Sequence, residues 1–162
     1  MTPTRPTFRR ARKADATKLN AALRRLSDGM GDTHRASDDQ IELSGFGPNP
    51  AFHAMLAELD GTIVGVAVYS PLFSTTRGMA GVYVSDLWID PEIRGRQMGV
   101  RLLSAVQKDA HASWEAGFIR LAVYHTNSRA KAFYQRLGFT ASTGEVTMTL
   151  DSEGLANLEK AL

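Results

Sequence analysis

The segment from Val82 to Val123 constrains the fold most, because a strand, a loop, a helix and a second strand follow one another in it. GVYVSDLWIDP alternates as a strand that ends at Pro91. FIRLAVYH predicts the next strand. Two strands of one sheet that are joined by a helix run parallel, so the segment predicts an α/β fold with a mixed sheet. An apolar stripe at helical spacing predicts the helix between them: Leu102, Leu103, Val106, Ala110 and Trp114. Gly117 is predicted to end this helix.

The rest of the chain supplies further elements of both kinds. Asp60-Gly61 lies between two apolar runs and predicts a hairpin turn, since both residues tolerate positive φ. The remaining expectations are an edge strand over 8–13, a helix over 19–26 stopped by Gly29, a long loop over 29–50 with a short helix near 38–43, a helix from 128 capped by Asn127 and followed by Gly138, and a final strand over 145–150.

Length and composition narrow the classes of protein. The 162 residues suit one domain, 1–162, that can bury a core without covalent staples. The chain has no cysteine, which excludes a thiol nucleophile and thiolate metal ligands, and its four histidines are scattered, so we expect no metal. The start has no apolar leader and no segment approaches the roughly 20 apolar residues of a membrane span. We therefore expect a cytoplasmic protein without a membrane partner.

The formal net charge is only +2, but basic residues gather at the start of the chain. Up to Arg25, Asp15 is the one acid among many lysines and arginines. A nucleic-acid-binding arm would explain this. A basic strand followed by a solvated helix face explains it as well and is preferred, because apolar residues run through the stretch at core spacing.

The loop RGRQMG before the predicted helix has the composition of an anion site. The first turn of a helix presents free N–H groups and a partial positive charge to phosphate. Arg94 and Arg96 add full charges, and Gly95 and Gly99 permit close approach of the backbone. The glycine pattern of a dinucleotide fold and the Lys-Ser/Thr pair of a P-loop are absent. From the residues alone, a phosphate loop and a plain basic turn remain open.

Two longer stretches resemble the GNAT superfamily of N-acetyltransferases. IRLAVYHTNSRAKAFYQRLGF is similar to the end of its catalytic core, and SDLWIDPEIRGRQMGVRLL to its acetyl-CoA segment, in which Arg-x-x-Gly-x-Gly precedes a helix. Gln97 replaces a glycine of that pattern. GFGPNPAFHAMLAELDG and YSPLFSTTRG look like the branch with spermidine/spermine and thialysine acetyltransferases. The resemblance implies a mixed, mostly antiparallel sheet flanked by helices, acetyl-CoA as co-substrate and a homodimer.

The same resemblance implies roles for particular residues. Tyr134 would be the general acid that protonates the departing CoA thiolate, although an inward-facing core tyrosine is the structural alternative. Asn127 would cap its helix and also bond the pantetheine arm. We expect binding to survive the change at Gln97 if that residue keeps φ below zero, with its side chain pointing away. The other residues implied in cofactor binding are Leu87, Trp88, Ile89, Arg94, Gly95, Arg96, Gln97, Met98, Gly99 and Val100.

The expected amine site centres on Asp86, which interrupts the apolar strand face that it shares with Val84 and Trp88. Asp86 could attract the ammonium of a substrate and relay its proton, or pair with a structural arginine. Polyamine enzymes of the branch have two neighbouring acids here, whereas this chain has Ser85-Asp86. A monoamine, an amino-acid-like amine or another small primary amine therefore fits better than a polycation. His125 could relay a base, but an exposed loop histidine is the simpler interpretation.

We expect an enzyme that acetylates a primary amine of a small molecule by direct attack in a ternary complex, since no cysteine can carry the acetyl group. Three alternatives stay open. The chain could acetylate a protein or peptide amine in a groove shaped by residues 29–50. It could be a non-catalytic acyl-CoA sensor. It could be a nucleic-acid-binding domain led by the basic start, although we expect no nucleic-acid partner.

Overall fold

The computed structural model describes residues 5–161, and the chain divides into two compact units, Met1–Ala122 and Val123–Leu162. The first unit contains a five-stranded sheet in the order β1-β2-β3-β4-β5. The first four strands pair antiparallel, and β5 pairs parallel to β4, so the predicted mixed and mostly antiparallel sheet is confirmed. The strands are β1 (Thr7–Arg10), β2 (His53–Leu59), β3 (Thr62–Ser74), β4 (Met79–Ile89) and β5 (Ile119–Leu121).

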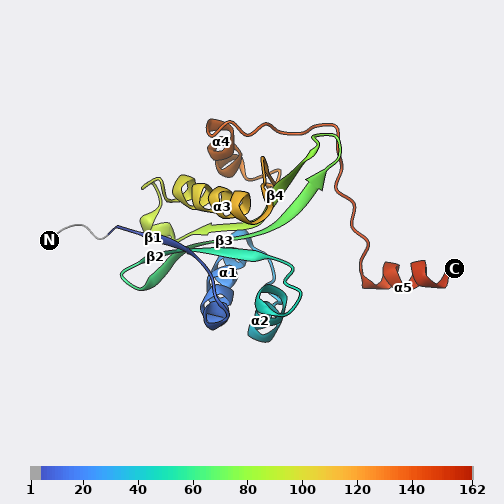
Figure 1. The fold of residues 1–162 in the computed structure, drawn as a ribbon, viewed down its shortest axis with the longest axis horizontal. Helices are drawn as coiled ribbons and strands as arrows, with labels where there is room; N and C mark the ends of the chain where they lie inside the picture. The colour runs from blue at the N-terminus through green and yellow to red at the C-terminus, as the bar shows by residue number, and fades with distance from the viewer. Residues whose placement is uncertain (1–4, 162) are drawn as a thin grey trace. The chain divides into compact units, whose positions relative to one another are not determined.

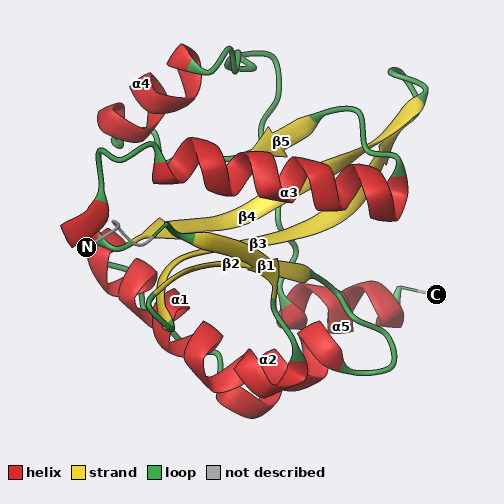
Figure 2. Ribbon diagram, turned by 60° about the vertical axis from the view of Figure 1, so that its left-hand side comes forward, coloured by secondary structure: helices red, strands yellow, loops and turns green. Residues whose placement is uncertain are grey.

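Helices cover both faces of this sheet. Helices α1 (Ala16–Met30) and α2 (Asp38–Phe46) lie on one face and α3 (Met98–Trp114) on the other, as Figures 1 and 2 show. Two short 3-10 helices, η1 (Lys13–Asp15) and η2 (Pro91–Ile93), lie before α1 and after β4. Helices α1 and α3 each turn buried apolar residues to the sheet, which places packed apolar side chains on either side of it.

Local sequence explains why these elements begin and end where they do. Helix α1 buries Leu19 and Leu23 and ends at Gly31, whose φ of 75° is the left-handed conformation of a C-cap. The prediction of a stop at Gly29 was two residues early. Asp60 and Gly61 have φ values of 51° and 77°, so the predicted hairpin turn between β2 and β3 is confirmed.

Other boundaries differ from the sequence-based expectations. Helix α3 ends at Trp114, with Glu115 as its C-cap residue at φ 54°, and not at Gly117. Strand β5 has three residues, fewer than the FIRLAVYH stretch suggested. The prediction of a strand over 145–150 was wrong: these residues belong to no strand, and a helix, α5 (Ser152–Lys160), follows them.

Several of the basic residues at the start of the chain, among them Arg9 and Arg25, form ion pairs. Arg9 contacts both Asp15 and Glu58 at 2.8 Å, which ties β1 to η1 and β2. Arg25 on α1 reaches Asp90 at 3.1 Å and lies over the ring of Trp88. These contacts support a structural role for the basic stretch. Among the described residues, no helix combines the length and apolarity needed to cross a membrane.

We expect stability to fall in acid because of the ion pair between Asp15 and Arg9. Hydrogen bonding to Arg9 lowers the pKa of Asp15 from 3.8 to about 2. The unfolded chain therefore takes up a proton first, so the stabilisation is complete above pH about 5 and is lost as pH falls from about 4 to about 2. It amounts to about 2 kcal/mol. Urea unfolding across this range measures it, and Asp15→Asn should show a flatter acid limb; equal slopes in both proteins would contradict the assignment.

Candidate active site

Ser85 forms a bulge in β4 that places two polar side chains together. Val68 of β3 pairs with Asp86, and the next residue, Tyr69, pairs with Val84, so Ser85 has no partner. The Ser85 hydroxyl donates to Asp86 Oδ2 at 2.9 Å and lies 3.3 Å from the Val68 carbonyl. A bulge therefore fixes the carboxylate of Asp86 in the middle of an otherwise apolar strand.

The bulge also changes which residues share a face. Asp86 is paired with Val68, which packs in the core cluster with Trp88 beneath α1. Val84 is paired with Tyr69, whose hydroxyl donates to Asp109 of α3 at 2.6 Å. The expectation that Asp86 shares a face with Val84 was therefore wrong, because one extra residue reverses the alternation. Asp86 lies on the side of α1 and α2, together with Trp88.

A cavity of about 380 Å³ opens on this side of the sheet. Its walls come from α1, α2, the loop between them, the segment before β2, and the strands β3 and β4. The volume falls in the range of small-molecule sites. The lining residues are Leu23, Ser27, His34, Ala36, Ile41, Ala51, Phe52, Val68, Ser70, Ser85 and Asp86.

A buried hydrogen-bond network holds the loop that forms one wall of this cavity. Asn20 on α1 is 2% exposed, and its amide donates to the Ala36 carbonyl at 3.0 Å and to Asp38 Oδ1 at 2.8 Å. Its carbonyl oxygen lies 2.8 Å from His34 Nε2, and His34 Nδ1 lies 3.0 Å from the Ser27 hydroxyl. Because every polar atom of Asn20 has a partner, the α1–α2 loop is fixed in position. Sequence reasoning did not identify this network.

Beyond the bulge, β4 offers backbone groups to a ligand. Strand β5 pairs with β4 only from Val82 to Val84, so Leu87, Trp88 and Ile89 have β3 as their one paired neighbour among the described strands. Trp88 is 4% exposed and belongs to the core, which leaves its backbone for any ligand contact. An unpaired strand edge can bind an extended chain of amides in the manner of an added strand.

The loop after β4 leads into α3 through two residues with positive φ. Gly95 has φ 82° and Gln97 has φ 57°. Gln97 is the N-cap residue, and its carbonyl accepts from Arg101 N–H at 3.0 Å. Arg94 Nε donates to the Ile89 carbonyl at 3.3 Å, which anchors the loop to the end of β4. Arg96 is exposed. The first N–H groups of α3, those of Met98, Gly99 and Val100, have no acceptor within the helix and can bind an anion.

Gln97 does not keep φ below zero, the condition on which binding was expected to survive the missing glycine. Its left-handed backbone is the conformation that a glycine adopts at no steric cost, and its side chain forms no cap hydrogen bond. The loop therefore keeps its turn in spite of the missing glycine, and the side chain of Gln97 is exposed.

We predict that Gln97→Gly stabilises the protein by about 0.5–1 kcal/mol, the relief of left-handed strain less the added freedom of the unfolded chain. Urea unfolding measures this change in the free energy of unfolding. Gln97→Ala is the matched control, since alanine keeps the strain and should give no gain. An equal gain in both variants would assign the effect to the side chain and contradict the backbone explanation.

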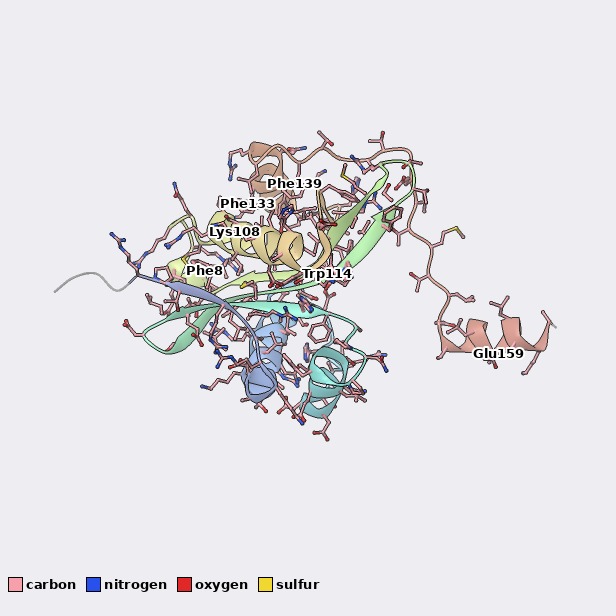
Figure 3. All side chains as sticks on the ribbon, in the orientation of Figure 1. Phe8, Lys108, Trp114, Phe133, Phe139 and Glu159 are labelled. Atoms are coloured by element: carbon pink, nitrogen blue, oxygen red, sulfur yellow. The ribbon has the colours of Figure 1, made fainter. Side chains whose placement is uncertain are left out.

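The second unit contains the predicted residues Asn127 and Tyr134. Asn127 caps helix α4 (Ser128–Arg136), with its Oδ1 accepting from Ala130 N–H at 3.1 Å. Tyr134 contacts the rings of Phe133 and Phe139, with centroids 5.1 and 5.4 Å away; both phenylalanines are labelled in Figure 3. Burial raises the pKa of the Tyr134 hydroxyl to about 12, so it is protonated at neutral pH. His125, in the same unit, is exposed.

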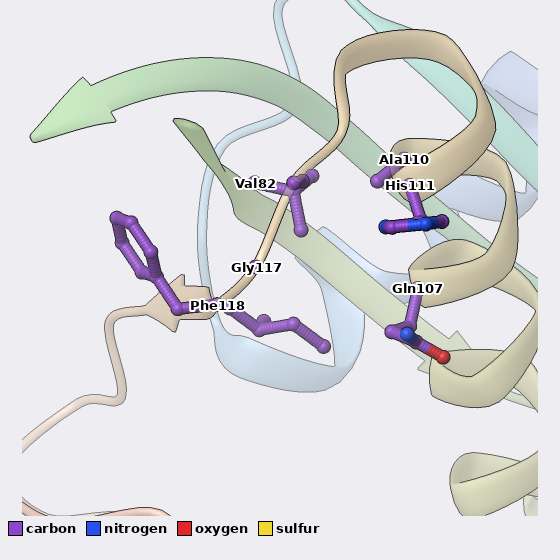
Figure 4. Close-up of a pocket in the computed structure, with 8 residues that line it drawn as sticks. Val82, Gln107, Ala110, His111, Gly117 and Phe118 are labelled. Atoms are coloured by element: carbon purple, nitrogen blue, oxygen red, sulfur yellow. The ribbon is translucent and has the colours of Figure 1, made fainter. Parts of the chain in front are cut away.

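Two other features of the first unit lie apart from the predicted residues. A cavity of about 310 Å³ between α3 and β5 is lined by Gln107 and His111, with the Phe118 ring turned away from α3 (Figure 4). On β2 and β3, His53 and Tyr69 both bond Asp109 of α3. Burial and then the charge of Arg10 lower the pKa of His53, which suits a neutral imidazole that fastens α3 to the sheet.

The structure thus brings Asp86, Leu87–Ile89 and the loop 94–100 onto one continuous strand–loop–helix segment, and it places Asn127 and Tyr134 together on one helix of the other unit. Among residues 5–161, no group of three or more His, Asp or Glu side chains is placed to hold a metal ion. The segment can bind an amide chain and an anion, and the cavity beside Asp86 can bind a cation.

Comparison with known proteins gives three kinds of likeness. A family model described as "Acetyltransferase (GNAT) family" matches residues 19–139. Thialysine N-epsilon-acetyltransferase of Mus musculus is 29% identical over 164 aligned residues, covering 93% of this chain and 95% of that protein. Among solved structures, an integron cassette protein of V. cholerae has a TM-score of 0.78 at 19% identity, covering 96% and 98% of the two chains. The aminoglycoside N-acetyltransferase AAC(6')-Iy in complex with CoA has a TM-score of 0.72 at 17% identity, covering 90% and 95%.

Proposed function

Because the chain belongs to the acetyltransferase (GNAT) family, we propose that it transfers the acetyl group of acetyl-CoA to a primary amine of a small molecule. It is an acetyl-CoA-dependent acetyltransferase, and its relatives are named for amine substrates. The cavity of about 380 Å³ with Asp86 in its wall carries the proposal of a small substrate. The family match extends over parts of both units, which supports the proposal that residues 1–162 act as one catalytic domain.

In this proposal, acetyl-CoA binds along β4 and the loop that follows it. The backbone of Leu87, Trp88 and Ile89 pairs with the two amides of the pantetheine arm. The pyrophosphate lies on the N–H groups of residues 95–100, with Arg94 and Arg96 supplying charge. Asn127 adds a polar contact to the pantetheine arm beyond its role as a cap. The free edge of β4 and the unpaired N–H groups at the start of α3 support this assignment.

The amine binds in the cavity as an ammonium ion beside Asp86. Alkyl ammonium groups have a pKa of about 10, so a proton must leave before the nitrogen can attack. The Asp86 carboxylate attracts the ammonium ion, accepts one proton from its nitrogen and passes that proton to water in the cavity. The neutral nitrogen then attacks the thioester carbonyl carbon directly, and a covalent acetyl-cysteine is excluded because the chain has no cysteine.

Collapse of the tetrahedral intermediate breaks the carbon–sulfur bond and leaves CoA as a thiolate, whose pKa as a thiol is about 8.5. Tyr134 donates its phenolic proton to this sulfur, the attached nitrogen releases its second proton to solvent as it becomes an amide, and Tyr134 regains a proton from solvent. The Tyr134 hydroxyl is protonated throughout the neutral range, as a general acid must be, and its burial, which raises the pKa to about 12, makes it a weaker acid than the CoA thiol.

Measurement of free thiol from acetyl-CoA across a panel of small amines, amino acids, aminoglycosides and peptides tests the proposal. We expect release with at least one small primary amine. Release with peptides alone would replace the proposal with a protein acetyltransferase. Thermal stabilisation by acetyl-CoA without release from any amine would replace it with an acyl-CoA sensor.

A homodimer, which the family resemblance led us to expect, stays a prediction. Light scattering of the purified protein at micromolar concentration measures the mass in solution directly. A mass of one chain across the concentrations used in the assay would contradict it.

A further inference from the structure

The cavity beside Asp86 has the charge of a site for one cation. Asp86 is the one acid among the residues that line it, and its other polar groups are three hydroxyls and the imidazole of His34. Both ring nitrogens of His34 already contact Ser27 and Asn20. Asp38 at the start of α2 accepts from Asn20 at 2.8 Å, so its carboxylate is part of the wall network. A second ammonium in this cavity would therefore find no second carboxylate among the residues that line it.

The carboxylate itself is set to receive a single ammonium. One oxygen of Asp86 accepts the hydroxyl of Ser85 at 2.9 Å, and the same hydroxyl lies 3.3 Å from the Val68 carbonyl. The bulge that holds Ser85 in place also holds this pair, so the carboxylate has a fixed position. An ammonium donates three hydrogen bonds and can share them between Asp86 and the neighbouring Ser70 hydroxyl, which lines the same cavity.

The remaining wall is apolar and well packed. Leu23 from α1, Ile41 from α2 and Val68 from β3 are each no more than 8% exposed, and Phe52 from the segment before β2 completes this surface. A charged group placed against it would lose hydration without gaining a partner. Each methylene group of a ligand that moves from water to such an apolar surface raises the affinity of the ligand about fourfold.

We propose that the amine substrate is a primary amine with a single positive charge and an apolar body, such as an unbranched alkylamine or an arylalkylamine. The ammonium binds Asp86, and the apolar body lies against Leu23, Ile41 and Phe52. This inference rests on the proposed acetyl transfer and names the class of its acceptor. Diamines and polyamines of the same length are poorer substrates, because their second charge meets the apolar wall.

The test compares amines of equal length that differ by one charge. Thiol release from acetyl-CoA is measured for butylamine and hexylamine and for the corresponding terminal diamines, with kcat/KM corrected for the two equivalent nitrogens of a diamine. We expect hexylamine to exceed hexamethylenediamine by about tenfold or more, and hexylamine to exceed butylamine by about fifteenfold, from two added methylenes. Equal or better use of the diamines would overturn the inference while leaving acetyl transfer to amines intact. Absence of thiol release with every amine, amino acid and peptide would overturn the proposed function itself.

Two variants of Ser85 test whether the charge of the cavity causes the preference for monoamines over diamines. Ser85→Asp adds a second carboxylate beside Asp86, and we expect the ratio of hexylamine to hexamethylenediamine to fall by about tenfold. Ser85→Asn is the matched control, because it has similar size without charge, and its ratio should stay that of the parent protein. An equal fall in both variants would overturn the charge argument.

A second measurement covers the case in which Ser85→Asp does not fold. Calorimetric titration of the parent protein with CoA present gives the Kd of hexylamine and of hexamethylenediamine without turnover. We expect the monoamine to bind about tenfold more tightly. Tighter binding of the diamine would overturn the inference.

Discussion

Tyr134→Phe is expected to lower kcat about 10²-fold, the usual effect of losing a general acid, with the Kd of acetyl-CoA little changed. The departing CoA thiolate must then wait for a proton from water. Phenylalanine keeps the ring that contacts Phe133 and Phe139, so the packing of this part of the second unit should persist. Steady-state kinetics and a titration with acetyl-CoA measure the two quantities separately.

The control for this substitution is Tyr124→Phe, which removes a hydroxyl from an exposed tyrosine of the same unit and should leave kcat near the parent value. Single-turnover measurements establish that chemistry is the slow step. Near-parent turnover of Tyr134→Phe under that condition would remove Tyr134 from the mechanism. The structural alternative, a core tyrosine, predicts a lower Tm and an unchanged kcat.

Asp86→Asn is expected to lower kcat/KM for the amine about 30-fold, or about 2 kcal/mol, and to leave acetyl-CoA binding unchanged. The amide has the size of the carboxylate, and its oxygen can still accept the Ser85 hydroxyl, so the bulge should persist. What it loses is the charge that attracts an ammonium ion. Initial rates at varied amine and saturating acetyl-CoA give the value.

Thermal unfolding distinguishes a functional from a structural Asp86. If the asparagine variant keeps its amine kinetics but melts at a lower temperature, the carboxylate supports the bulge and takes no part in substrate binding. Ser85→Ala is a useful companion, since it removes the hydrogen bond at Asp86 Oδ2 and leaves the charge. It should impair amine use less than Asp86→Asn does.

Periodicity in the sequence predicted most of the elements that position the site. The apolar stripe of α3, the hairpin at Asp60-Gly61 and the cap at Asn127 are each local patterns, and the structure has all three. The phosphate loop was open from its residues alone and became an expectation through the family resemblance. Local sequence patterns thus predicted the strand, loop and helix around Arg94. The role of this loop in binding phosphate was expected only from the family resemblance.

The predictions that the structure contradicts depend either on contacts between distant parts of the chain or on backbone conformation. Polar and apolar residues alternate over 145–150 as they do in a strand. A strand also requires a neighbouring strand to pair with, and the alternation does not indicate which segment that would be. In the structure Val146 and Met148 are 87% and 90% exposed. The bulge at Ser85 shifts register by one residue without a mark in the sequence. Gln97 adopts a glycine conformation that its identity argued against.

The cavity beside Asp86 could not be predicted, because its walls come from segments that are far apart in the sequence. Leu23, Ile41 and Val68 are ordinary core residues in the sequence, and only the fold brings them to one surface beside Asp86. The Asn20 network is similar: a polar residue on an apolar helix face signals a buried hydrogen bond, but its partners Ala36 and Asp38 are known only from the folded loop.

Mass spectrometry of the products formed from acetyl-CoA and a small primary amine, together with the amount of free CoA, distinguishes acetyl transfer from binding of acetyl-CoA alone. Acetyl transfer predicts the N-acetylated amine and free CoA in equal amounts, with both formed about 10²-fold more slowly by Tyr134→Phe. Binding of acetyl-CoA without any acetylated amine, across the whole panel of small amines, would contradict the account.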